Sequence, residues 1–268
     1  MGVDTYVYLV FDKKPEEVED FLKREFKVEV RDEEFGDARM DYLRGKGLLG
    51  EDFQLITSGE LLFDPPLRTD DGETIVDADF RIYTVKGYTI LEIHPNPRSW
   101  WWFVLSSEVI RLLKQFMKAE PLLICGYRDD TDLTELGFEQ DMSYLLINLL
   151  PETIKNRKLE ILPSGLTVVK KELLGIEDGL YELIERPRRE EKEYVLVKTL
   201  DNYKVLVSIE EIDLTDEECY SDILEDKALF SLKIVGLTFK RIGRKVEDEF
   251  LIKRAEEYFK AQVGEDGR

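Results

Sequence analysis

Residues 87–120 carry the clearest pattern of apolar and polar positions in the chain. Residues 87–93 place apolar side chains on both faces of an extended chain, because successive strand residues point to opposite sides of a sheet. From Glu108 onward, apolar residues recur every three or four positions, which is the spacing of one helical face. Pro95 and Pro97 lie between the two patterns and cannot donate to a strand ladder. The stretch therefore predicts a central strand, a turn and an amphipathic helix.

The first half of the chain contains further predicted strands joined by short turns. Residues 4–11 predict an interior strand, which is followed by a helix that begins at Pro15. Short connections rich in Gly, Pro, Ser and Asp predict antiparallel neighbours. The other strands of this half are predicted at residues 27–30, 53–57, 60–63, 75–85 and 121–127. A turn at Ser58 and Gly59 separates the second and third of these.

The second half is predicted to be rich in strands and to end in a helix. Pro163 to Gly165 predict a joint between two domains. Strands are predicted at residues 167–174, 180–185, 194–200, 203–209, 229–235 and 238–242, and helices near residues 217–224 and from residue 245. The predicted fold class is α+β: a mostly antiparallel sheet packed by helices, with a second, smaller α+β domain. Residues 1–163 are predicted to form the first domain, with a Trp-rich strand-loop-helix core, and residues 164–268 the smaller β-rich second domain, with a C-terminal helix.

The loop after the predicted central strand contains candidate binding residues. Trp100, Trp101 and Trp102 are all the tryptophans of the chain, and His94 is its only histidine. One interpretation makes an exposed indole, together with His94 and Arg98, a recognition anchor, because aromatic residues supply much of the energy at interfaces. The other makes the indoles the cover of a core edge and His94 a hydrogen-bonded structural residue. A catalytic or metal-binding imidazole is a third possibility, but a site built from two or more histidines is excluded.

An acidic segment follows the predicted strand at residues 121–127. Its candidate metal ligands are Asp129, Asp130 and Asp132. Carboxylates at the end of a strand are the oxygen ligands that Mg²⁺ and Ca²⁺ prefer, and the fold could bring Asp77, Asp79 or His94 near them. The spacing does not match a calcium-binding loop, so a solvated acidic loop or a helix start is the alternative.

Composition limits the classes of partner and the cellular compartment. The formal net charge of -20 opposes contact with a phosphate backbone, so no nucleic acid is expected as a partner. Cys125 and Cys219 belong to no Cys-x-x-Cys pair, which favours a reducing, cytoplasmic setting over a secreted one. No apolar run is long enough to cross a bilayer, so no membrane partner is expected. The abundance of Glu and Lys, with few Gln, Asn, His and Cys, is typical of thermostable proteins.

The sequence leaves three hypotheses about function open, and no known catalytic motif in it is complete. The first is a non-catalytic protein-interaction or regulatory module that engages a partner through the tryptophan segment. The second is a divalent-metal-dependent hydrolase or phosphotransfer enzyme built on the acidic segment. The third is a small-ligand-binding protein with a pocket between the two halves. The sequence leaves open whether the protein is an enzyme.

Overall fold

Eleven strands and two complete helices lie in the part of the chain that the computed structural model describes. That part comprises residues 4–31, 45, 52–68, 74–96, 107–129, 151, 154, 166–175, 177–183, 193–210 and 239–241. The helices are α1 (Pro15–Glu25) and α3 (Ser107–Met117). The strands are β1 (Asp4–Phe11), β2 (Lys27–Arg31), β3 (Gln54–Arg68), β4 (Thr74–Val85), β5 (Tyr88–Asn96), β6 (Leu123–Asp129), β7 (Leu166–Lys170), β8 (Gly179–Leu183), β9 (Glu193–Leu200), β10 (Tyr203–Glu210) and β11 (Phe239–Arg241).

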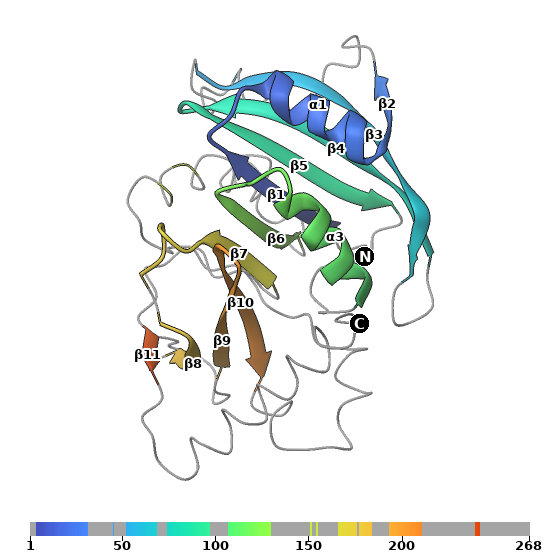
Figure 1. The fold of residues 1–268 in the computed structure, drawn as a ribbon. Coiled ribbons are helices and arrows are strands. Elements are labelled where there is room, and N and C mark those ends of the chain that lie inside the picture. Colours follow the sequence, from blue (N-terminus) through green and yellow to red (C-terminus); the bar gives the residue numbers. More distant parts are fainter. Residues whose placement is uncertain are drawn as a thin grey trace.

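All eleven described strands belong to one sheet, in the order β11-β8-β9-β10-β7-β6-β1-β5-β4-β3-β2. Every pair of neighbours is antiparallel. The strands of the first half run from β6 to β2, and those of the second half run from β7 to β11 (Figure 1). The two sets are joined where Cys125 of β6 lies opposite Thr167 of β7.

The predicted fold class, α+β with a second α+β domain, is therefore wrong. The described chain is mainly one large antiparallel sheet, and its two complete helices are only 11 residues each. The cause of the error is that strands of the second half continue the first sheet through β6 and β7, and such pairing leaves no local mark in the sequence. The division at residue 163 into two independently folding domains stays a prediction.

Both helices pack on the same face of the sheet. Figure 1 shows α1 lying over the strands β3 to β5 and α3 over β1 and β6, and their buried residues share one core with those strands. Pro15 at the start of α1 and the acids of its first turn suit a helix N-terminus. The helix residues that enter the core are Val18, Phe21 and Leu22 of α1 and Leu112, Leu113 and Phe116 of α3. Burial of each such side chain contributes about 1.5–3 kcal/mol to folding, so both helices are held by this face.

The central strand and the amphipathic helix predicted within residues 87–120 are confirmed, but the strand does not end before Pro95, because β5 continues through Pro95, opposite Ala78, to Asn96. β5 lies between β1 and β4, as expected for a strand that is apolar on both faces. Ile90, Leu91 and Ile93 are each fully buried. The amphipathic helix predicted from Glu108 is α3. Residues 97–106, with the three tryptophans, lie outside the described residues.

The turn predicted at Ser58 and Gly59 is wrong, because β3 runs unbroken through both residues. Gly59 instead allows a close approach of β2. A Cβ atom at this position would lie 2.3 Å from the carbonyl oxygen of Glu29 and 2.8 Å from the Phe80 ring. The residue is glycine because β2 and Phe80 occupy the space of a side chain.

Candidate functional site

Polar residues gather on the face of the sheet opposite the two helices, called here the polar face. Its members are Tyr6, Tyr8, Glu29, Arg31, Glu60, Asp77, Asp79, Arg81, Glu92 and His94. The strand register brings them into rows, because directly opposite residues of an antiparallel pair share a face. One row joins Glu29, Glu60, Asp79 and His94 across β2, β3, β4 and β5. The next row joins Arg81, Glu92 and Tyr8 across β4, β5 and β1.

The centre of the polar face holds an ion pair whose carboxylate is buried. Arg81 donates a hydrogen bond from Nη1 to Glu92 Oε1 at 2.8 Å. Glu92 is 1% exposed, and its second oxygen, Oε2, has no hydrogen-bond partner among the described residues. A carboxylate is costly to bury, so this pair depends on Arg81 remaining in place. The carboxylate of the pair is buried, whereas the Arg81 side chain is 29% exposed.

His94 lies beside this pair and stacks on an aromatic ring. The rings of Tyr6 and His94 are 4.7 Å apart between centroids, with an angle of 16° between their planes. On its other side His94 is opposite Asp79 of β4. The stacking is compatible with both a structural role and a recognition role for His94, and both stay predictions. Within the described residues, no three side chains of His, Cys, Asp or Glu are grouped so that they could hold a metal ion.

The acidic end of the polar face lies next to β2. Arg31 forms ion pairs with Glu60 and with Asp79, the latter at 3.1 Å between Nη2 and Oδ1. Burial, followed by the charges of Glu60 and Asp79, raises the pKa of Asp77 against the opposing effect of Arg31. One guanidinium thus serves two of the carboxylates in this cluster.

β2 ends the described sheet and is largely exposed. It pairs with β3 on one side, and no other described strand pairs with its outer side. Four of its five residues are exposed; only Val28 is half-buried, against the core. Val30 is 49% exposed, and its opposite residue on β3 is Gly59, which offers no side chain to cover it. A strand edge of this kind has backbone groups available to another chain.

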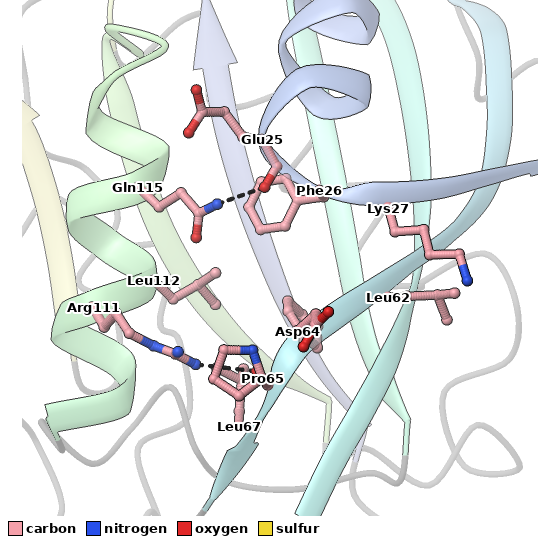
Figure 2. A pocket seen from close by; sticks show the side chains of 11 residues that line it. Glu25, Phe26, Lys27, Leu62, Asp64, Pro65, Leu67, Arg111, Leu112 and Gln115 are labelled. Atoms are coloured by element: carbon pink, nitrogen blue, oxygen red, sulfur yellow. Dashed lines mark hydrogen bonds between the residues drawn. The ribbon is translucent and has the colours of Figure 1, made fainter.

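A small cavity opens between the end of α1, the strand β3 and the helix α3. Figure 2 shows its apolar floor around Phe26 and its polar rim, where Gln115 Nε2 donates to the carbonyl oxygen of Glu25 at 2.7 Å. The cavity has a volume of about 70 Å³, enough for a few water molecules or one small side chain. It lies within the first half of the chain, and the predicted pocket between the halves stays a prediction.

The structure places only some of the residues predicted to form a site. His94 is at the end of β5, and Asp129 is the last residue of β6, with its Cα opposite that of Asp4. The others lie outside the described residues: Arg98, Trp100, Trp101, Trp102, Asp130 and Asp132. β5 and β6 both end on the side where β1 begins, so the last described residues before the tryptophan segment and within the acidic segment lie at the same end of the sheet. The anchor and metal-site predictions for these segments remain predictions.

Two features of the site were not found from the sequence. The alternation of residues 87–93 placed Glu92 within an apolar strand, and a charged residue in such a strand is a signal for a buried partner. The partner, Arg81, could not be named because it depends on the register of β4 and β5. The short strand at residues 27–30 was predicted, but its position at the edge depends on the order of strands in the sheet.

Comparison with known proteins does not add a family to this description. No protein-family model and no curated protein sequence matches the chain. Among the described residues, no helix combines the length and the apolar character needed to cross a lipid bilayer.

Proposed function

We propose that this protein is a non-catalytic interaction module, and that the outer edge of β2 receives an extended segment of a partner as an additional strand. The observation that supports this most directly is the exposure of β2. Its outer side faces no described strand, and Val30 is 49% exposed there. Extended segments add to open sheet edges through main-chain hydrogen bonds, and alternate side chains then give specificity.

The other end of the sheet is a weaker candidate. β11 has three residues, whereas β2 has five. A longer strand offers more backbone groups to an added strand, since each pair of residues contributes to the ladder. β2 also carries Lys27, Glu29 and Arg31 on one face, and charged residues on an edge strand limit indiscriminate pairing. Among the described strands the outer side of β2 is therefore unpaired, and its charged residues would make the pairing of an added strand selective.

The test uses a synthetic peptide whose charges complement β2, Thr-Glu-Val-Lys-Val-Glu-Thr. We expect it to protect the backbone amides of residues 27–31 from hydrogen exchange, because an added strand accepts hydrogen bonds from the outward-facing amides. A control peptide with both valines replaced by proline keeps the charges but cannot complete a strand ladder. It should give no protection.

A pair of protein variants provides the matched control. Val76 is 48% exposed but lies on β4, between β3 and β5. Val30→Lys removes the apolar contact at the edge and should weaken peptide binding about fivefold, whereas Val76→Lys should leave it within about twofold. Absence of protection in residues 27–31 with the valine peptide, or equal protection by the proline peptide, would overturn the proposed function.

A further inference from the structure

The chemistry of β2 also indicates which strand it receives. We infer that the occupant is β2 of a second copy of this chain, paired antiparallel about a two-fold axis that passes between the two Val30 residues. This inference rests on the proposed function, because it names the occupant of the same edge. It follows from the charge pattern of β2 and from the surroundings of Val30.

The charges of β2 are complementary to themselves in this register. Lys27, Glu29 and Arg31 lie on one face of β2 and alternate in sign along it. When Val30 lies opposite Val30 of the second copy, Glu29 of each copy lies opposite Arg31 of the other. Opposite charges directly across an antiparallel pair are stabilising, and like charges are destabilising. The register centred on Glu29 is disfavoured, since it would place the two Glu29 residues together and Lys27 against Arg31.

Val30 favours this register over one centred on Val28. Val28 already packs against the core of its own chain. Val30 is 49% exposed, and its neighbour across β3 is Gly59. The open side of β2 is therefore the side from which a cross-strand side chain can cover Val30. In the two-fold arrangement each Val30 supplies that side chain to the other.

The expected association is weak and reversible. Two five-residue strands bury much less than the roughly 1,200–2,000 Å² of a stable protein–protein interface. The net charge of -20 on each copy adds repulsion, which salt at physiological strength reduces. Covalent cross-linking is consequently a better measure of this association than the molecular mass in dilute solution.

Cysteine cross-linking tests the pairing and its register. Opposite residues of an antiparallel pair have Cα atoms about 4.5–5.5 Å apart, which is within the range that a disulfide can bridge. Under mild oxidation Val30→Cys should form a reducible dimer at least about fivefold more efficiently than Val76→Cys, whose position has nearly the same exposure away from the edge. Val28→Cys should cross-link less than Val30→Cys.

A charge reversal separates local pairing from net charge. Adding Glu29→Arg to Val30→Cys places two guanidinium groups opposite each other, the introduced one and that of Arg31 in the second copy, so the cross-linking yield should fall about fivefold. Glu16→Arg makes the same change of net charge on the exposed start of α1 and should not lower the yield.

The outcomes distinguish this inference from the proposed function. If Val30→Cys cross-links no better than Val76→Cys or Val28→Cys while the valine peptide protects residues 27–31, the second copy is not the occupant and the proposed function stands. Equal loss of yield with Glu29→Arg and Glu16→Arg would also overturn the inference. If neither cross-linking nor peptide protection occurs, both proposals fail.

Discussion

The substitution Gly59→Ala should separate β2 from the sheet. The new Cβ would lie 2.3 Å from the Glu29 carbonyl oxygen, which belongs to the backbone of β2, and 2.8 Å from a carbon of the Phe80 ring. Phe80 is 1% exposed, so its ring has little room to move. If the sheet stays intact, relieving this steric clash costs about 1–3 kcal/mol, as at other overpacked sites. The clash can also be relieved if β2 separates from β3, which loses the five residue pairs from Lys27↔Leu62 to Arg31↔Ser58.

Urea unfolding and hydrogen exchange together test this reasoning. We expect the free energy of unfolding to fall by about 2 kcal/mol, or the inward-facing amides of residues 27–31 to lose protection, whichever costs less. Gly175→Ala is the matched control, because a Cβ at that position would meet no atom within 4 Å. It should change the free energy of unfolding by less than about 0.5 kcal/mol. The close approach would not be the reason for glycine if Gly59→Ala also stayed within that limit and kept the protection of β2.

Three further predictions concern the described residues of the sheet. Burial raises the pKa of the Cys125 thiol from 9.0 to about 12. The stability that the neutral thiol contributes is therefore complete below pH 9 and is lost as the pH rises toward 12. Cys125→Ala should reduce the decline of the free energy of unfolding in that interval, measured by urea titration. Tyr203 donates from its hydroxyl to the Pro121 carbonyl oxygen at 3.0 Å, and Tyr203→Phe should cost about 1–2 kcal/mol in the same assay. Burial alone would raise the pKa of Asp178, but hydrogen bonds from Lys204 and Thr199 outweigh burial and lower the pKa. The ionised carboxylate therefore stabilises the fold at neutral pH, and this stabilisation is lost as acid protonates Asp178 in the folded protein. Asp178→Asn should lower stability at neutral pH by about 1 kcal/mol and reduce the loss in acid; an unchanged acid profile would contradict this.

The elements that the sequence predicts correctly are those with a strong local pattern. α3 has an apolar stripe at helical spacing, and β5 is apolar on both faces, so neither assignment needs knowledge of distant residues. The same applies to the strands predicted at residues 194–200 and 203–209, which the structure contains as β9 and β10. The turn predicted at Ser58 and Gly59 fails for a different reason. Glycine is common in turns, but here its lack of a side chain serves the contact with β2.

The candidate site is less predictable because it depends on register and strand order. Glu92 and Arg81 are eleven residues apart, and they pair because β4 and β5 align them. Glu60 and Asp79 approach Arg31 only because β2, β3 and β4 are neighbours in that order. Pairing between strands follows from the whole sheet, whereas hydrophobic periodicity reports only which face of each strand is buried. For the same reason, hydrophobic periodicity does not predict the pairing of β6 with β7, which makes the predicted fold class wrong.

The two ends of the polar face differ in what they could contribute to binding. The Arg81–Glu92 pair has its carboxylate buried, so a partner could reach it only after the covering atoms moved. Glu29 and Arg31 at the edge are exposed, but exposed ion pairs contribute only about 0.2–1 kcal/mol each. Charge at the edge therefore selects the register of an added strand, and most of the affinity must come from main-chain hydrogen bonds and the contact at Val30. For that reason the proline peptide, which keeps the charges and removes the ladder, tests the proposed function more stringently than any change of charge.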